Sequence, residues 1–301
     1  MQTAIIKKSV QGASHKASNK ICQDAHKVIR TENGAYVLAV ADGHGSSVCR
    51  LSDRGAKKAV ETFCDIAKGV LNLSVPENDI LEIFAGKGKK EIPKIVSERW
   101  KERVQKSFEQ LSIKDESLND SNVSVPELYG STLLGLVITD KYIYAMQIGD
   151  GDIVFVSENG VNYVIEPPKF LGTETFSLSN EKPWENVVIH FQRIEYKEKV
   201  PCMFMLSSDG FSNSFKDDEQ FFVAAKEYFE TLKTYGGNRV QRELGNWLSQ
   251  TSEEGCGDDI TLVAIGFFED EPSITEDTDD IEVADESENC AMQEQLDSAT
   301  S

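Results

Sequence analysis

The sequence predicts an α+β fold built from layers of strands and helices, because strand patterns and helix patterns occur in separate blocks. Strand patterns occupy the early, middle and final parts of the chain, and two helical blocks lie between them. The chain has 301 residues, of which 40% are hydrophobic, so it can bury a sizeable core. We expect one globular domain over residues 1–268 and a separate tail over residues 269–301.

The first two strands are expected over residues 25–31 and 35–41, which are rich in Val, Ile, Tyr and Leu. Between them lies an Asn-Gly pair at positions 33–34, which suits a tight hairpin turn. In an antiparallel hairpin, the start of one strand lies beside the end of the other. We therefore expect Asp24 and Asp42 to lie close together.

The pattern becomes helical over residues 51–113, and residues 114–125 are polar and typical of a loop. In the second part of the helical block, large apolar residues recur every four positions, as expected for one face of a helix. These residues are Ile92, Val96, Trp100, Val104 and Phe108. We interpret this face as packing against a sheet.

The remaining elements are predicted from the same patterns. Strands rich in β-branched and aromatic residues are expected over residues 131–139, 142–148, 153–156, 187–191, 201–206 and 260–268. Helices are expected over residues 218–231 and 239–251. Because the connections in the middle are short, the sheet there is predicted to be mostly antiparallel.

The net charge of −20 is unevenly distributed along the chain. The tail carries 13 of the 51 carboxylates and no Lys or Arg, which leaves about −7 for the body. Such a tail cannot bury enough apolar area to offset the entropy of ordering, so we expect it to be disordered. An acidic body does not attract nucleic acid or an anionic membrane, and we exclude both as partners.

The six cysteines are scattered and form no CxxC pair, which is typical of reduced thiols in a cytosolic protein. The N-terminus lacks an apolar signal core, and no apolar run approaches the ~20 residues that span a bilayer. We therefore expect a cytoplasmic protein.

Short acidic segments at the ends of predicted strands indicate the chemistry of the protein. Asp42 and Asp209 follow strands, whereas Asp24 and Asp258 precede them, so antiparallel pairing brings the four side chains to one edge. Carboxylates this close repel one another unless cations compensate their charge. Oxygen ligands without Cys favour Mg²⁺ or Mn²⁺ over zinc.

Two such cations about 4 Å apart would share a bridging hydroxide and hold a phosphoryl group during in-line attack. His44 directly follows the Asp42-Gly43 pair, and an imidazole titrates near neutrality. We therefore expect His44 to protonate the leaving alkoxide while Asp42 holds the cations. The residues predict a hydrolytic site for phosphate esters.

The sequence resembles the metal-dependent protein phosphatases of the type 2C, or PPM, class, and in particular a bacterial branch of it. The resemblance extends from about residue 12 to residue 268 and depends on six segments in the family's order. The segments are Gln23-Asp24-Ala25, Val40-Ala41-Asp42-Gly43-His44-Gly45, Gly130-Ser131-Thr132, Gly149-Asp150, Ser208-Asp209-Gly210 and Asp258-Asp259-Ile260-Thr261.

The resemblance implies that Asp42 bridges two Mg²⁺ or Mn²⁺ ions and that the Gly43 carbonyl helps to hold the second ion. It further implies that Asp209 and Asp258 complete the shell of the first ion, and that Asp24 contacts metal-bound water. The implied fold is a four-layer α-β-β-α sandwich of two antiparallel sheets flanked by helices.

Asp150 matches the family's position for a weaker third ion, which it would share with Asp209. Many relatives place a phosphate-binding Arg at the position that Asn19 occupies in this chain. His15 or Lys20 is a candidate to bind phosphate instead, although a Lys lacks the bidentate fork of Arg.

The implied activity is hydrolysis of phosphoserine and phosphothreonine on protein substrates, with a cognate serine/threonine kinase as signalling partner. A second hypothesis is a pseudophosphatase that binds phosphoproteins without turnover, which the missing Arg at Asn19 favours. A third is a phosphatase for a small phosphorylated molecule. The irregular region over residues 161–183 is the expected specificity element, because relatives carry a flap there.

Overall fold

The computed structural model describes residues 2–112, 123–168, 175–194 and 200–269. The chain divides into two units after Glu269. The predicted disordered tail, from Asp270 on, lies outside the described residues, as does most of the loop predicted over residues 114–125. All of the described helices and strands belong to the first unit.

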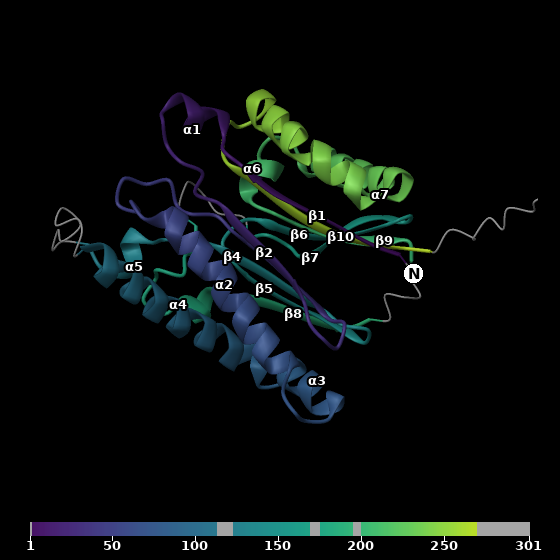
Figure 1. The fold of residues 1–301 in the computed structure, drawn as a ribbon, viewed down its shortest axis with the longest axis horizontal. Coiled ribbons are helices and arrows are strands. Elements are labelled where there is room, and N and C mark those ends of the chain that lie inside the picture. Colours follow the sequence, from purple (N-terminus) through teal and green to yellow (C-terminus); the bar gives the residue numbers. More distant parts are fainter. Residues whose placement is uncertain (1, 113–122, 169–174, 195–199, 270–301) are drawn as a thin grey trace, which may run out of the picture. The chain divides into compact units, whose positions relative to one another are not determined.

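Within the described residues, the strands form two five-stranded antiparallel sheets, which lie face to face (Figure 1). The first sheet has the spatial order β1 (Gln2–Val10), β10 (Ile260–Phe268), β9 (Cys202–Ser207), β6 (Asp152–Ser157) and β7 (Gly160–Ile165). The second has the order β2 (Ala25–Arg30), β3 (Tyr36–Ala41), β4 (Leu133–Ile138), β5 (Tyr142–Ile148) and β8 (Val188–Arg193).

Helices cover the outer face of each sheet. The second sheet is covered by α2 (Ser52–Leu71), α3 (Glu77–Ala85), α4 (Gly88–Ser112) and α5 (Val125–Leu128). The first sheet is covered by α6 (Asp209–Ser212) and α7 (Asp218–Glu254). Two short elements, α1 (Ala13–Ala17) and the 3₁₀ turn η2 (Pro183–Asn186), complete the unit. The predicted α+β four-layer sandwich is confirmed.

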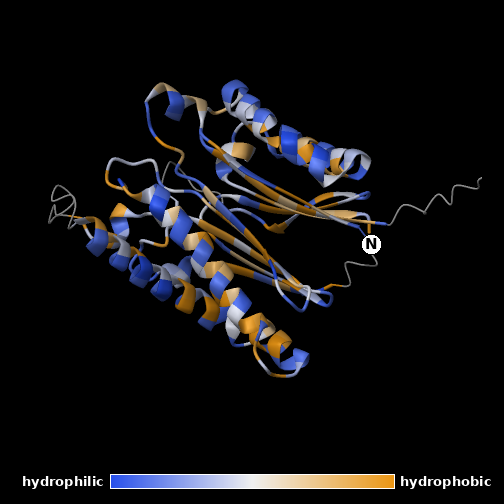
Figure 2. Cartoon of the chain, in the orientation of Figure 1, coloured by the Kyte–Doolittle hydropathy of each residue, from blue (hydrophilic) through white to orange (hydrophobic). Residues whose placement is uncertain are grey.

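Three buried clusters of apolar side chains correspond to the three interfaces between the layers. One lies between the two sheets, where Leu38, Leu136 and Phe204 are fully buried. The others lie between each sheet and its helices, where α4 contributes Trp100 to one cluster and α7 contributes Phe229 to the other. Figure 2 shows the same pattern, with hydrophobic colour concentrated on the strands and both colours on the helices.

The hairpin of β2 and β3 forms as the sequence predicts. Its register pairs Ala25 with Ala41, which puts the residue before β2 beside the residue after β3. The turn uses Gly34 at φ 85°, a left-handed conformation that an L residue rarely adopts. The Asn-Gly signal therefore fixes the register that brings Asp24 and Asp42 together.

Two strands were not predicted. β1 contains Lys7, Lys8 and Ser9 and is stabilised by pairing along its whole length with β10 at the other end of the chain, which no local pattern reveals. β7 lies at the start of the region predicted to be irregular, and it pairs with β6. In contrast, the two helices predicted after residue 218 are present as α7, which is broken at Gly236 with φ 71°.

His26 on β2 gives the first testable prediction. Its Nδ1 lies 2.9 Å from Ser9 Oγ, which also accepts the Thr261 hydroxyl, so the ring is held inside the fold. Burial, with Lys7 and Lys8 nearby, lowers the pKa of His26 from 6.5 to about 4.

Between these two pH values the unfolded chain binds a proton that the folded chain does not, so folding stability is lost as pH falls from 6.5 to about 4. We expect His26→Gln to remove roughly 1–3 kcal/mol of that loss. Urea unfolding of both proteins from pH 4 to pH 7.5 measures it. Equal pH slopes would contradict the prediction.

Candidate metal centre

Four strand ends from the two sheets bring the predicted carboxylates together. Asp42 directly follows β3, and Asp24 directly precedes β2. Asp209 lies two residues after β9, and Asp258 lies two residues before β10. The charges of Asp24, Asp209 and Asp258 each act on Asp42, so the four side chains form one electrostatic cluster.

The backbone around Asp42 is held by the segment before β4. The Asp42 N–H donates to Thr132 Oγ1 over 2.9 Å, and the Thr132 N–H donates to the Asp42 carbonyl over 2.8 Å. Gly43 forms a β-bridge with Ser131. A Cβ atom on Gly43 would lie 2.6 Å from the Ser52 carbonyl oxygen, so only glycine fits there.

Asp24 is the most buried of the four side chains, with 5% of its surface exposed. Ser208 donates a hydroxyl to Asp24 Oδ2 over 2.7 Å. Among the described residues, no group donates to Asp24 Oδ1. A buried carboxylate oxygen without a donor is costly, and a cation would satisfy it.

The electrostatics of the cluster show how strongly its members repel. Desolvation, together with the neighbouring carboxylates, raises the pKa of Asp42 well above its usual value. Burial raises the pKa of Asp24 to about 7, although the Ser208 hydrogen bond opposes the rise. Burial and the charge of Asp150 raise the pKa of Asp209 to about 6. At neutral pH the cluster therefore needs protons or cations.

The donor set fits hard divalent cations, because it consists of carboxylates gathered at one edge with an unpartnered oxygen among them. In the described ranges, no group of three or more His, Cys, Asp or Glu side chains already has the spacing of a metal shell. The strand ends that carry the carboxylates nevertheless bring them within electrostatic reach of one another.

Asp150 and His44 flank this cluster. The charge of Asp150 acts on both Asp209 and His44. Burial lowers the pKa of His44, and Asp150 partly opposes that change. The backbone N–H of His44 donates to the Gly130 carbonyl over 3.1 Å, and a Cβ on Gly130 would lie 2.8 Å from the imidazole ring. The Gly130 segment therefore fixes the position of the histidine.

Comparison with protein families identifies the chain. The family model described as protein phosphatase 2C matches residues 11–249. The chain belongs to the protein phosphatase 2C family. The enzyme class predicted from the sequence, a protein serine/threonine phosphatase, is thereby confirmed. A comparison with curated protein sequences finds no significant match.

Solved bacterial phosphatases share the fold. Stp1 from Staphylococcus aureus has a TM-score of 0.56 at 11% identity, over 89% of this chain and 96% of that chain. PstP from Mycobacterium tuberculosis has a TM-score of 0.54 at 12% identity, over 89% and 100%. The catalytic domain of PstP in complex with two manganese ions has a TM-score of 0.54 at 15% identity, over 89% and 99%.

The two candidate phosphate-binding residues of this phosphatase have different surroundings. Lys20 Nζ lies 3.5 Å from the carbonyl oxygen of Gly45, which belongs to the same segment as Asp42. His15 instead lies beside Asp258 and Asp259, with its Nδ1 2.9 Å from Asp259 Oδ1. Asn19 adopts a left-handed conformation with φ 54°.

Sequence reasoning assigned no role to three residues that shape the site. Thr132 lies in a segment used only for the resemblance, and Asp259 follows Asp258 directly. Asp152 is 2% exposed, and burial raises its pKa to about 7, with the charge of Asp209 contributing. In the sequence, all three residues are distinguished only by lying in or next to a motif, and that position does not reveal where a side chain points.

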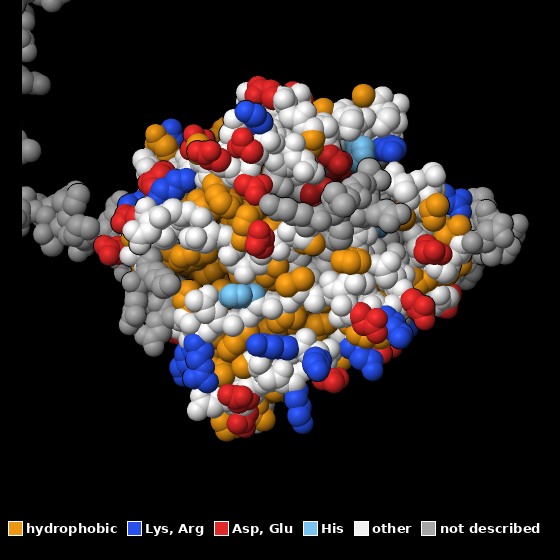
Figure 3. Space-filling model, turned by 180° about the vertical axis from the view of Figure 1, so that it is seen from behind, with side chains coloured by type: hydrophobic (Ala, Val, Ile, Leu, Met, Phe, Trp, Pro, Cys, Tyr) orange, Lys and Arg blue, Asp and Glu red, His pale blue; other side chains and the backbone are white. Residues whose placement is uncertain are grey.

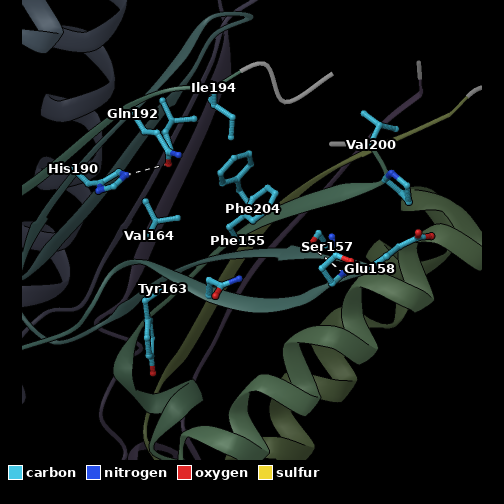
Figure 4. Close-up of a pocket in the computed structure, with 14 residues that line it drawn as sticks. Phe155, Ser157, Glu158, Tyr163, Val164, His190, Gln192, Ile194, Val200 and Phe204 are labelled. Atoms are coloured by element: carbon cyan, nitrogen blue, oxygen red, sulfur yellow. Dashed lines mark hydrogen bonds between the residues drawn. The ribbon is translucent and has the colours of Figure 1, made fainter. Parts of the chain in front are cut away.

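A cavity of about 550 Å³ lies elsewhere in the domain, between the edge strands β7 and β8. Figure 4 shows Phe155, Phe204 and Val164 in its wall, with His190 and Gln192 hydrogen-bonded to each other. None of the clustered carboxylates lines it. Seen from behind, the domain also exposes apolar side chains across the middle of its surface (Figure 3).

The helices in the described ranges do not meet the requirements for crossing a bilayer. None of them has a stretch of the length and hydrophobicity that a membrane span needs.

Proposed function

We propose that this phosphatase hydrolyses phosphoserine and phosphothreonine esters on proteins with two Mg²⁺ or Mn²⁺ ions, and with a third ion bound more weakly. The observation that supports the proposal is the gathering of Asp24, Asp42, Asp209 and Asp258 at one edge, with raised pKa values for the first three and an unpartnered oxygen on Asp24. The related PstP structure with two manganese ions agrees with this choice of cofactor.

Each ligand would have a distinct task. Asp42 would contact both ions, the Gly43 carbonyl would hold the second, and Asp209 with Asp258 would complete the first. Asp24 would accept a hydrogen bond from metal-bound water, and Asp150 would hold the third ion. When bound, the ions supply an activated solvent molecule and neutralise charge on the phosphoryl group.

His44 would donate a proton to the serine or threonine oxygen as the ester bond breaks. Its lowered pKa makes the protonated form scarce at neutral pH, but that form is a stronger acid than an ordinary imidazolium. Gly130 packs against the ring and limits its rotation. Lys20 would attract the phosphate as a point charge.

The substrates would be phosphorylated proteins produced by a cognate serine/threonine kinase in the cytoplasm. The region around β7 and the segment before η2 would select among them, since it includes the predicted flap over residues 161–183. Residues 169–174 of that flap lie outside the described residues. We assign the phosphatase domain to residues 1–268 and treat residues 269–301 as a separate acidic tail.

A phosphothreonyl peptide incubated with Mn²⁺ tests this function. We expect phosphate release that depends on Mn²⁺ and that falls at least about 100-fold in Asp209→Asn, because the amide neutralises one ligand of the first ion. Peptide binding without release by the wild-type chain would instead support a pseudophosphatase. Release only from small phosphorylated molecules would support the third hypothesis.

A further inference from the structure

The Ser208 hydroxyl contacts one oxygen of the buried Asp24 carboxylate. Ser208 Oγ donates to Asp24 Oδ2 over 2.7 Å, although the two residues are 184 positions apart. Both side chains are buried, so bulk water does not compete for this hydrogen bond. The other carboxylate oxygen, Asp24 Oδ1, accepts no hydrogen bond from the described residues. The two oxygens of Asp24 therefore have different surroundings.

The end of the ladder between β9 and β10 fixes the Ser208 side chain. The pairing of Ser207 with Leu262 places Ser208 opposite Thr261. At a hydrogen-bonded pair of an antiparallel ladder, each residue donates its N–H to the carbonyl of the other. Here the Ser208 N–H donates to the Thr261 carbonyl over 3.0 Å, but the Thr261 N–H donates to Ser208 Oγ over 2.9 Å. Because Oγ accepts this N–H, it is held in place with its own proton free to be donated to Asp24.

The backbone on both sides of Asp24 is held as well. The Gln23 N–H donates to Asp259 Oδ2 over 2.7 Å. On the other side, Ala25 pairs with Ala41 in the β2–β3 hairpin. The freedom that remains to Asp24 is rotation of its side chain, and the Ser208 hydrogen bond restricts that rotation. A carboxylate that is oriented beforehand loses less conformational entropy when it takes part in a metal centre.

We propose that Ser208 is a positioning residue for Asp24: its hydroxyl holds Oδ2 and thereby turns Oδ1 toward the water that the metal ions bind. This inference rests on the proposed function, in which Asp24 accepts a hydrogen bond from that water. Ser208 acts through the Asp24 carboxylate and holds no ion itself.

Ser208→Ala tests this role by removing the donor. We expect calorimetric titration with Mn²⁺ to show about 10-fold weaker binding than wild type, the lower end of the effect of residues that orient metal ligands. With a phosphothreonyl peptide at saturating Mn²⁺, kcat should fall about 10-fold while KM changes less than about 2-fold, because the buried Ser208 does not contact the peptide. Ser208→Cys, whose thiol fills the site but donates weakly, is the second variant and should lower both values in the same direction.

Ser207→Ala is the matched control. Ser207 is fully buried next to Ser208, and its hydroxyl has no hydrogen-bond partner among the described residues. Its removal deletes the same atom from the neighbouring position without taking a donor from Asp24. The Mn²⁺ affinity and kcat of Ser207→Ala should therefore equal those of wild type.

A double-mutant cycle with Asp24 separates positioning from a general effect on folding. If Ser208 acts through Asp24, Ser208→Ala should change the Mn²⁺ affinity less than about 2-fold in the Asp24→Ala background. A serine with a merely structural role would instead lower the affinity by the same factor in both backgrounds.

Three results would overturn the inference: wild-type Mn²⁺ affinity and kcat in the Ser208 variants, equal losses in Ser208→Ala and Ser207→Ala, or a raised KM with unchanged kcat. The wild-type protein separates this inference from the proposed function. If wild type binds Mn²⁺ and releases phosphate but Ser208→Ala does so equally well, only the inference fails. If wild type binds Mn²⁺ without releasing phosphate, the proposed function fails and the Mn²⁺ affinities still decide the inference, whereas a wild-type chain that binds no Mn²⁺ overturns both.

Discussion

Asp42→Asn is expected to abolish Mn²⁺-dependent phosphate release, with a loss of at least about 10³-fold, or roughly 4 kcal/mol in the activation free energy. Asp42 is the carboxylate on which the charges of Asp24, Asp209 and Asp258 converge. The amide keeps the shape of the side chain but removes the charge that would hold both cations. Initial rates on a phosphothreonyl peptide, with calorimetric titration of Mn²⁺, measure the effect.

The same substitution is expected to stabilise the protein when no metal is present. An amide relieves repulsion within the cluster, and it can donate to the unpartnered Asp24 Oδ1. Asp79→Asn on the exposed surface of α3 is the matched control, with activity and stability close to wild type. If Asp42→Asn keeps wild-type turnover, Asp42 has no part in the mechanism. If the variant is less stable than wild type without metal, repulsion between the carboxylates does not destabilise the metal-free protein.

Much of the candidate site was predictable because its proposed ligands lie at strand ends and the hairpin signal is local. The Asn-Gly turn at residues 33–34 sets the register of β2 and β3, and the register sets the distance between Asp24 and Asp42. The predicted fold class followed from blocks of strand and helix patterns. Both signals arise from neighbours in the sequence, so they can be interpreted without knowledge of the tertiary contacts.

The features that were missed depend on contacts between distant segments. β1 is a strand because β10 pairs with it, and a stretch containing Lys7 and Lys8 carries little strand signal alone. The surroundings of His15 are similar, since Asp259 lies 244 positions further along the chain. Residue type suggested a phosphate-binding role for His15, but only the contacts between α1 and the segment before β10 show that its ring lies beside carboxylates.

Without bound metal, the free energy of unfolding is expected to decrease as pH rises, because of the raised pKa values in the carboxylate cluster. Unfolded aspartates ionise near pH 3.8, whereas the pKa of Asp24 is raised to about 7 and that of Asp209 to about 6 in the folded, metal-free chain. Between pH 4 and pH 7 the folded state therefore holds protons that the unfolded state has released. Stability without metal should fall as pH rises through this window, by an amount on the order of a few kcal/mol.

His26 acts in the opposite direction over an overlapping range, because the unfolded chain binds its proton between pH 6.5 and about pH 4. The His26→Gln protein is therefore the appropriate background for the measurement. In that background, the urea midpoint of unfolding in EDTA should decrease from pH 4.5 to pH 7. The midpoint follows the free energy of unfolding because the m-value, which reports the surface exposed on unfolding, should be similar at each pH.

Saturating Mn²⁺ should restore the midpoint most strongly at pH 7, where binding has the fewest protons to displace from the carboxylates. The difference between the Mn²⁺ and EDTA midpoints should thus widen as pH rises, and His26 cancels from that difference. Parallel curves from pH 4.5 to pH 7 would mean that the cation does not replace protons within this cluster, and its binding site would then have to be sought elsewhere in the chain.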